Sequence, residues 1–246
     1  MRFLILSDLH SNLQALEAVV EHAAGAYDQV LCLGDVVGYC ADPNPVTDWI
    51  RQHAAAIVRG NHDRACTGDA VIECFSGPAQ FAALWTYGAL NPENREWLQE
   101  LPQGPVAIGD FFLVHGSPKD EDDYLLNKCD AAEVSRHMPG AICFFGHTHV
   151  QGGFAMRRGR TWLIPHPKPK ESHHTHQLEP DTSYLLNPGS AGQPRDGDPR
   201  AAYAIFEMES KVITFCRAPY DVATAQDRIR KAKLPYFLAD RLSVGR

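Results

Sequence analysis

The sequence predicts an α/β (α+β) protein of four layers, αββα, in which two packed mixed β-sheets are flanked by helices. Two observations support this fold class. The first half of the chain alternates strands and helices in the order βαβαβ, and the second half is rich in short strands separated by turn residues. No internal repeat is evident, and 246 residues suit one domain, so we expect a single domain over residues 1–246.

The first half opens with a strand over residues 3–6, a continuous apolar run typical of a strand covered on both faces. Ser11 and Gln14 then have the spacing of a capping box, ahead of an apolar helical stripe. The same criteria predict strands over 30–33 and 55–58, a helix over 46–53, and mostly helical structure over 65–101, with helices near 79–84 and 92–101.

The second half begins with a hairpin, because residues 106–108 and 111–114 flank the turn pair Gly109-Asp110. The remaining patterns predict helices over 131–137 and near 221–232, and strands over 141–145, 151–157, 161–165, 183–187, 201–207 and 211–217.

Two segments of the second half lack such patterns. Residues 166–182 are polar and rich in proline, which indicates a mobile surface loop, and residues 233–246 form an irregular C-terminal tail. The run His173-His174-Thr175-His176 falls in the loop. We interpret it as solvated, with metal binding as the alternative.

The composition narrows the class of protein. A net charge of −7 argues against a stable nucleic-acid partner, which requires a basic face. The seven cysteines are odd in number and form no CxxC pair, so we expect buried, reduced thiols in a cytoplasmic protein. No apolar run approaches the roughly 18 residues that a membrane span requires.

Five short polar clusters follow the predicted strands, at the sheet edge where ligands bind in α/β proteins. They are Asp8-Leu9-His10, Gly34-Asp35, Gly60-Asn61-His62-Asp63, His115-Gly116 and Gly146-His147-Thr148-His149. Mixed carboxylate, amide and imidazole ligands suit Mn, Fe or Zn better than Mg or Ca. Seven such ligands are too many for one ion and suit two divalent ions, about 3.5–4 Å apart, that activate a water and clamp a phosphoryl group.

These five motifs resemble the signature of the calcineurin-like metallophosphoesterase superfamily, which reads D-x-H, G-D-x-x, G-N-H-[DE], H and G-H-x-H. The match spans residues 8–149. The resemblance implies a double β-sandwich flanked by helices. It also implies a ligand assignment in which Asp35 bridges two ions, one held by Asp8, His10 and His149 and the other by Asn61, His115 and His147.

His62 carries no ligand duty in the resemblance. Beside two metal ions it is a candidate catalytic acid for the leaving group and a candidate phosphate-binding residue, together with Asn61. Asp63 is the second catalytic candidate, because a carboxylate partner fixes the tautomer of an imidazole. The alternative for Asp63 is a cap of the following turn.

The stretch Asn187-Pro188-Gly189-Ser190 and its continuation to Asp198 resemble smaller bacterial phosphoesterases and the diadenosine tetraphosphatase group of the same superfamily. Arg195 in this stretch is a candidate bidentate ligand for substrate phosphate. The alternative is a pairing of Arg195 with Asp196 or Asp198. Arg59 and Arg64 are weaker candidates.

Two function hypotheses follow. The first is a hydrolase, a phosphodiesterase or phosphatase, in which a metal-bridging hydroxide attacks a small phosphate mono- or diester, with a dinucleotide polyphosphate or other nucleotide as the alternative substrate. The chain is shorter than a eukaryotic phosphatase catalytic domain, which argues against a phosphoprotein substrate. The second hypothesis, a non-catalytic metal-binding scaffold, is disfavoured because no expected ligand is missing.

Overall fold

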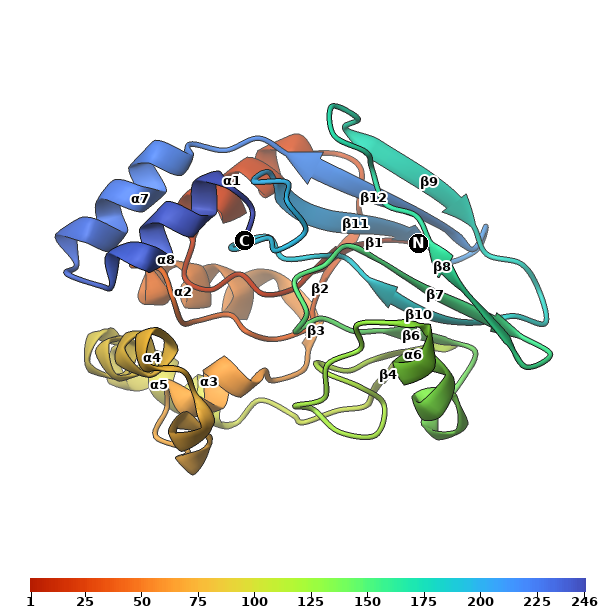
Figure 1. Cartoon of the computed structure of the whole chain (residues 1–246), viewed down its shortest axis with the longest axis horizontal. Helices are drawn as coiled ribbons and strands as arrows, with labels where there is room; N and C mark the ends of the chain where they lie inside the picture. The colour runs from red at the N-terminus through yellow and green to blue at the C-terminus, as the bar shows by residue number, and fades with distance from the viewer.

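Two six-stranded mixed sheets form the centre of the protein (Figure 1). The structure is a computed structural model that describes all residues, 1–246. The first sheet has the strand order β3-β2-β1-β11-β12-β9, with β1 to β3 mutually parallel. Its strands are β1 (Arg2–Leu6), β2 (Gln29–Cys32), β3 (Ala54–Ile57), β9 (His173–Gln177), β11 (Ala201–Glu207) and β12 (Val212–Ala218).

The second sheet has the order β4-β5-β6-β10-β7-β8, with β5, β6 and β10 mutually parallel. Its strands are β4 (Val106–Ile108), β5 (Phe111–Leu113), β6 (Ile142–Phe144), β7 (Gly152–Arg157), β8 (Arg160–Ile164) and β10 (Ser183–Asn187). The predicted strands agree with these to within a residue at each end.

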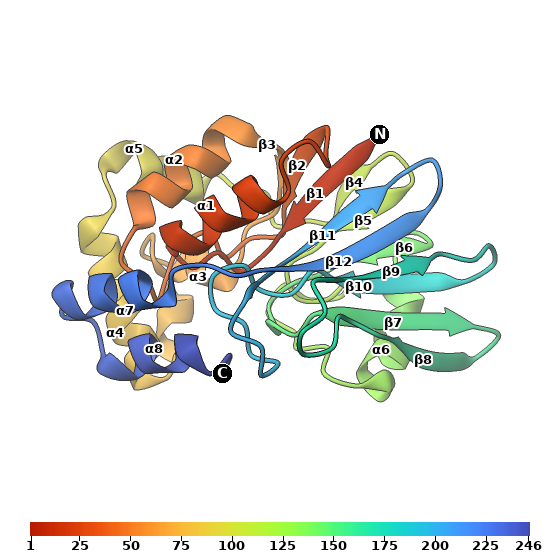
Figure 2. The same ribbon diagram turned by 90° about the horizontal axis from the view of Figure 1, so that it is seen from above.

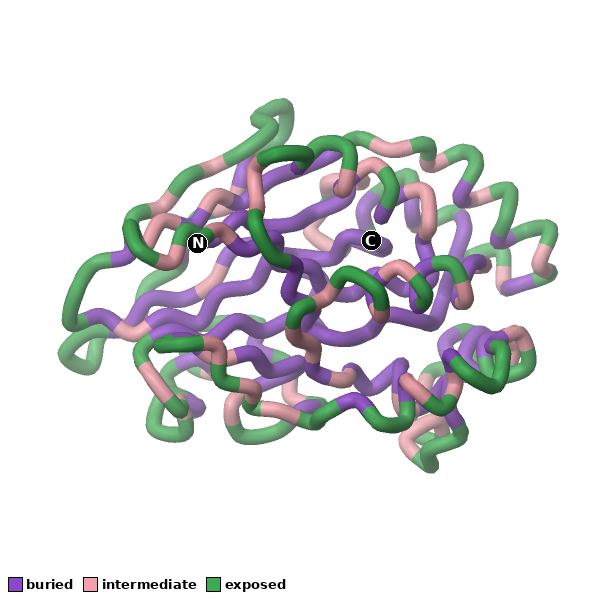
Figure 3. Tube along the Cα trace, turned by 180° about the vertical axis from the view of Figure 1, so that it is seen from behind, coloured by how far each residue is buried: buried purple, intermediate pink, exposed green.

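Side-chain alternation along β1 shows how the layers are held together. Phe3 and Ile5 point into the core between the two sheets, and Leu4 and Leu6 point into the core between the first sheet and its helices. The inter-sheet core includes edge-to-face contacts of Phe111 with the rings of Phe3, Phe144 and Phe206, at centroid distances of 5.4, 5.5 and 5.3 Å. Burial is concentrated along the sheets (Figure 3).

Helices cover the outer faces of both sheets, which completes the four layers and confirms the predicted fold class (Figure 2). Helices α1 and α2 pack on the first sheet and α6 packs against β7 and β8. The helices are α1 (Leu13–His22), α2 (Pro43–His53), α3 (Asn61–Ala65), α4 (Gly77–Ala89), α5 (Pro92–Gln99), α6 (Lys128–Val134), α7 (Val222–Lys231) and α8 (Tyr236–Asp240), with 3₁₀ turns at Ala70–Cys74, Ser135–His137 and Arg241–Ser243. None of these helices is long and apolar enough to cross a bilayer.

Two segments predicted to be irregular are ordered elements. Residues 173–177 form β9, the edge strand that pairs antiparallel with β12, so the prediction of a surface loop over 166–182 is wrong for its second half. The tail 233–246 contains α8, whose Leu238 and Ala239 are buried against α7 together with Leu242. Both elements take their stability from partners distant in sequence.

Two local predictions also need correction. The cap of α1 is Asn12, which accepts a hydrogen bond from the Ala15 amide, and not Ser11, whose φ of 58° places it outside a capping geometry. All seven cysteines are free, and five are buried, but Cys74 and Cys129 are exposed.

Candidate metal centre

The five polar clusters lie at the carboxyl ends of strands from both sheets: β1, β2 and β3 of the first and β5 and β6 of the second. Five candidate ligands lie at sharp turns of the chain. Their backbone conformations are left-handed, with φ between 47° and 64°: Asp8, His10, Asp35, His147 and His149. This conformation is uncommon for residues other than glycine, and Asp and His tolerate it better than most. The turns bring all seven predicted ligands into one buried site.

Asp35 lies at the centre of the site. Its Oδ2 is 3.5 Å from His10 Nε2 and 3.5 Å from His115 Nε2. Its Oδ1 accepts a hydrogen bond of 2.8 Å from the His62 amide, which fixes the carboxylate plane. One oxygen of Asp35 is therefore shared by two groups of potential ligands.

The first group consists of Asp8, His10, Asp35 and His149, whose donor atoms all lie within 4.8 Å of one another. His149 Nε2 is 3.0 Å from His10 Nε2 and 3.3 Å from Asp8 Oδ1. Ligand atoms bound to one ion at about 2.0–2.2 Å lie about 3 Å apart, so these spacings are those of a coordination shell.

The second group consists of Asp35, His115 and His147, again within 4.8 Å of one another. Asn61 joins it, because its Oδ1 is 3.3 Å from His115 Nε2. Its four members follow four strands of the two sheets, β2, β3, β5 and β6.

Backbone carbonyls fix the tautomers of three histidines. His10 Nδ1 lies 3.1 Å from the Val37 oxygen, His115 Nδ1 lies 2.7 Å from the Leu33 oxygen, and His149 Nδ1 lies 2.6 Å from the Gln193 oxygen. A carbonyl only accepts, so each Nδ1 carries the proton and each neutral ring directs the lone pair of Nε2 into the site. This arrangement is common in metal-binding histidines.

The buried atoms that lack hydrogen-bond partners test whether a cation fits here. They include Asp8 Oδ1, Asp35 Oδ2 and His147 Nε2, all of which face the site. Unpartnered buried acceptors cost free energy, and electron pairs that converge at 3.0–3.5 Å repel unless a cation lies among them. The donor set, oxygen and imidazole nitrogen without thiolate, fits divalent Mn, Fe or Zn.

Burial governs the protonation of most site histidines. It lowers the pKa of His147 to about 3 and holds the pKa values of His10 and His149 well below the ordinary range. Burial also raises the pKa of Asp8 to about 7, and the charge of Asp35 adds to the effect. The imidazoles of His10, His147 and His149 are therefore neutral, which is the form that binds metal.

His115 behaves differently because it faces Asp35. Burial acts to lower the pKa of His115, but the charge and hydrogen bond of Asp35, together with the charge of Asp8 and the Leu33 carbonyl, raise that pKa to about 10. Conversely, burial acts to raise the pKa of Asp35, but His115 holds it well below its usual range. Without a cation in the site, a second proton on His115 supplies the positive charge that faces Asp35, and a metal ion bound by Nε2 would take the place of that proton.

Asp63 does not orient His62. Its two carboxylate oxygens accept four backbone N–H bonds of 2.9–3.2 Å, from Gly60, Asp35, Val36 and Val37. No hydrogen bond joins Asp63 to His62, so the hypothesis that Asp63 fixes the His62 tautomer is not supported. Asp63 caps the start of α3 through the Gly60 amide and does not cap the turn that follows it. Asp63 joins the Gly60 turn to the Asp35 turn.

Glycine is required at the junction of these turns. A Cβ on Gly60 would lie 2.0 Å from Asp35 Oδ1, and a Cβ on Gly146 would lie 2.0 Å from Ser7 Oγ. The Ser7 hydroxyl itself donates a 2.6 Å hydrogen bond to Asp8 Oδ2. The ligand-bearing turns are thus in backbone contact with one another.

The stretch after β10 supports the site from the other side. Asn187 Nδ2 donates hydrogen bonds to the Gly146 oxygen at 2.9 Å and to Thr148 Oγ1 at 3.0 Å. Ser190 Oγ donates to the Asp8 oxygen at 2.7 Å. Asn187 and Ser190 therefore hold the first and last ligand turns in place, a role that the sequence indicated only through the nearby glycines.

A cavity of about 490 Å³ opens onto the site. The three candidate substrate-binding residues Asn61, His62 and Arg195 line it, together with the candidate ligand His147. Arg195 donates to Tyr39 Oη at 3.2 Å and pairs with no carboxylate. The alternative partners of Arg195 are engaged elsewhere, since Asp196 pairs with Arg217 and Asp198 with Arg200.

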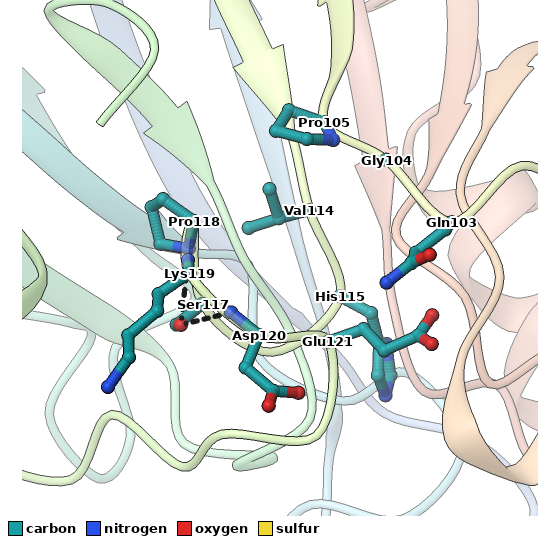
Figure 4. A pocket seen from close by; sticks show the side chains of 10 residues that line it. All are labelled: Gln103, Gly104, Pro105, Val114, His115, Ser117, Pro118, Lys119, Asp120 and Glu121. Atoms are coloured by element: carbon teal, nitrogen blue, oxygen red, sulfur yellow. Dashed lines mark hydrogen bonds between the residues drawn. The ribbon is translucent and has the colours of Figure 1, made fainter. Parts of the chain in front are cut away.

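Arg59 and Arg64 do not face this cavity as free cations. Both pair with Glu121, and Arg64 also contacts Asp122 at 3.1 Å. Glu121 projects beside His115 at a small hollow of about 60 Å³ (Figure 4). Their suggested role in phosphate binding is therefore not supported. The cavity residues that sequence patterns missed are aromatic or lie in the tail: Tyr39, Phe75, Tyr124 and Arg241.

A two-sheet αββα fold with buried Asp, Asn and His donors at its strand ends is the architecture of a metallophosphoesterase. A domain model described as the calcineurin-like phosphoesterase superfamily domain matches residues 1–167, and the chain belongs to that superfamily. The resemblance inferred from the sequence motifs is thereby confirmed.

Three relatives cover nearly the whole chain. An uncharacterised protein of Methanocaldococcus jannaschii is 33% identical over 254 residues, which cover 98% of this chain and 97% of the relative. The crystal structure of a metallophosphoesterase from Sphaerobacter thermophilus has a TM-score of 0.88 at 39% identity, and covers 100% of this chain and 99% of its own. A hypothetical protein from Pyrococcus horikoshii shares the fold, with a TM-score of 0.79 at 20% identity over 100% of this chain and 98% of its own.

Proposed function

We propose that the protein hydrolyses a small phosphate mono- or diester with the help of two divalent ions. The single observation that supports two ions is the position of Asp35 Oδ2, 3.5 Å from a histidine of each ligand group. Asp8, His10 and His149 would hold one ion, Asn61, His115 and His147 the other, and Asp35 both. Such ions supply Lewis-acid stabilisation of phosphoryl charge and an activated water nucleophile.

His62 is the candidate proton donor of the reaction. Its ring lines the cavity beside Asn61, and its Nδ1 has no hydrogen-bond partner. Burial lowers the pKa of His62 to about 4, so the ring is neutral before substrate binds. The negative charge of a bound phosphate raises that pKa and favours the protonated ring, which can then donate its proton to the leaving oxygen.

Arg195 is the candidate phosphate ligand. Its guanidinium is half-buried at the cavity wall, where its Nε has no partner. A planar guanidinium donates two parallel hydrogen bonds to a phosphate, so Arg195 would orient the phosphoryl group before reaction. Asn61 and His62 would contact the same group from the opposite turn.

The proposal is tested with the Mn-loaded protein and its Asp35→Asn variant. The substitution keeps the shape of the side chain but removes its charge, so metal content and activity on p-nitrophenyl phosphate should fall together, the activity by at least about 10²-fold. An Asp35→Asn variant that retains full activity would overturn the mechanism.

The substrate class is addressed by a parallel assay of p-nitrophenyl phosphate and bis-p-nitrophenyl phosphate. Faster turnover of the diester favours nucleotide diesters, and faster turnover of the monoester favours small phosphometabolites. Stoichiometric metal with no turnover of any phosphate ester would instead support a metal-binding scaffold.

A further inference from the structure

Two arginines of the cavity lack the ion pairs that most other buried and half-buried arginines of the chain form. Nine arginines form ion pairs with Asp or Glu side chains: Arg2, Arg51, Arg59, Arg64, Arg157, Arg200, Arg217, Arg228 and Arg230. Arg195 and Arg241 are half-buried, line the same cavity, and pair with no Asp or Glu side chain. Partial burial of two cations in one cavity is unfavourable, and an anion bound between them would offset that cost.

Arg195 is fixed next to the metal ligands. Its amide donates to the His149 oxygen at 3.1 Å, and its guanidinium contacts Tyr39 Oη at 3.2 Å and Gln193 Oε1 at 3.4 Å. These neutral contacts leave its positive charge uncompensated. One end of the pair therefore lies at the ligand turns.

Arg241 reaches the cavity from the C-terminal tail. It follows α8, whose buried Leu238 and Ala239 pack in the same apolar cluster as Tyr39 and Cys40 (Figure 1). Its guanidinium lies 5.2 Å from the Phe237 ring and donates through Nε to the Arg246 oxygen. Burial lowers the pKa of Arg241, and the charge of Arg195 lowers it further, which places the two cations within electrostatic reach of each other.

The other residues that line the cavity limit what a group bound by Arg195 and Arg241 can contact. The one carboxylate at the cavity, Asp122, faces Arg64 at 3.1 Å. The other lining side chains near the pair are apolar or aromatic, among them Tyr39, Phe75 and Tyr124. These surfaces suit an organic group that carries anions.

We propose that Arg195 and Arg241 form a subsite for a second anionic group of the substrate, a phosphate or a carboxylate close to the scissile phosphoryl group. This inference rests on the proposed function, because it places the scissile group between the candidate ligands and Arg195, and the second anion between Arg195 and Arg241. Arg241 is then a specificity-determining residue. The chain selects doubly anionic phosphate esters over simple ones.

The test is isothermal titration calorimetry of the full-length protein, at a fixed concentration of free Mn²⁺, with three non-hydrolysable probes. Ethylphosphonate carries one anionic group, phosphonoacetate adds a carboxylate, and methylenediphosphonate adds a second phosphonate. The wild type should bind at least one doubly anionic probe about tenfold more tightly than ethylphosphonate, the gain expected of charge-assisted hydrogen bonds. The better probe identifies the second group.

Arg241→Gln should remove most of this preference, measured as the ratio of dissociation constants. Arg241→Met, which keeps the apolar stem over Phe237, should do the same and serves if the first variant folds poorly. Arg246→Gln is the matched control, because Arg246 is exposed in the same tail, and it should keep the ratio. An unchanged ratio in folded Arg241→Gln or Arg241→Met overturns the inference.

A parallel assay of p-nitrophenyl phosphate hydrolysis separates this inference from the proposed function. A wild type that hydrolyses the ester but binds all three probes equally overturns the anion subsite and leaves the hydrolase. A wild type that hydrolyses no ester, yet shows a preference that Arg241→Gln abolishes, overturns the hydrolase and supports the subsite.

Discussion

Five candidate ligands have a backbone conformation that costs most side chains free energy, at φ values of 47° to 64°. Such strain persists only where the surroundings determine the conformation strongly, and it clusters at functional sites. Here hydrogen bonds hold the conformation in place. Asp63 accepts them from four backbone N–H groups, and three histidines donate them to backbone carbonyls. At the scale of single residues, the site is therefore held in shape by the protein itself.

His62 provides a direct test of proton donation. His62→Gln should retain metal, because no ligand is changed, but should lower kcat about 10²-fold on phenyl phosphate, whose leaving oxygen requires a proton. On p-nitrophenyl phosphate, with its good leaving group, the loss should be much smaller. An equal loss on both esters would indicate that His62 only binds substrate.

The seven candidate ligands could be placed together from the sequence because each follows a strand, and short polar turns after apolar runs are visible in the sequence. The role of Asp63 could not be predicted from the sequence. Its carboxylate binds the amides of Val36 and Val37, which lie 27 and 26 residues away along the chain. Arg241 was equally hidden, because nothing near it in the sequence marks the cavity. Contacts made only in the folded state leave no local pattern.

At the scale of elements, the turn after β10 connects ligand turns from both sheets. Asn187 contacts the turn after β6, and Ser190 contacts the turn after β1. Residues that position metal ligands typically change metal affinity about 10- to 100-fold when removed. The turn should therefore act on metal binding without supplying a ligand.

Asn187→Ala should weaken Mn²⁺ binding about tenfold, because it frees the turn that carries His147 and His149, and should also lower the free energy of unfolding by about 1–3 kcal/mol. Asn94→Ala is a matched control. Asn94 is also fully buried and donates to Asp48 Oδ1 at 2.9 Å and to Asn44 Oδ1 at 3.2 Å. The Asn94→Ala variant should lose a similar free energy of unfolding with unchanged Mn²⁺ affinity. Equal Mn²⁺ affinity in Asn187→Ala and Asn94→Ala would contradict the role assigned to Asn187.

Strands with apolar runs were predicted well, and β9 and α8 were missed for different reasons. The β9 sequence His-His-Thr-His-Gln has no apolar residue, because an edge strand needs only the ladder with β12 to persist. Helix α8 has five residues, too few for a helical period to be recognised, and depends on its packing against α7. In both elements tertiary contacts outweigh local propensity.

At the scale of the whole molecule, the site joins the two sheets. Asp8, His10, Asp35 and Asn61 follow strands of the first sheet, and His115, His147 and His149 follow strands of the second. The inter-sheet core of aromatic and aliphatic side chains lies directly behind them. A cation that binds both sets of ligands would link the sheets, so metal occupancy should affect the stability of the entire fold.

Metal binding should therefore raise the melting temperature. A ligand at 100 times its dissociation constant stabilises the folded state by about 2.7 kcal/mol, and about 1 kcal/mol shifts the melting temperature of a chain this size by about 2–4 °C. Saturating Mn²⁺ should thus raise the melting temperature of the metal-free protein by about 5–10 °C in a thermal denaturation scan, and EDTA should reverse the shift. Ca²⁺, which prefers oxygen ligands, should shift it less.

The Asp35→Asn variant turns this measurement into a test of the shared carboxylate. Because Asp35 Oδ2 is near both ligand groups, its neutralisation should weaken both sites, so Mn²⁺ should shift the melting temperature by only a small fraction of the wild-type value. The metal-free variant should be less stable than the metal-free wild type, because Asp35→Asn removes the anion that faces the protonated His115. If Asp35→Asn instead keeps half of the Mn²⁺ shift, one group binds its ion without Asp35, and the carboxylate does not connect the two sheets through metal.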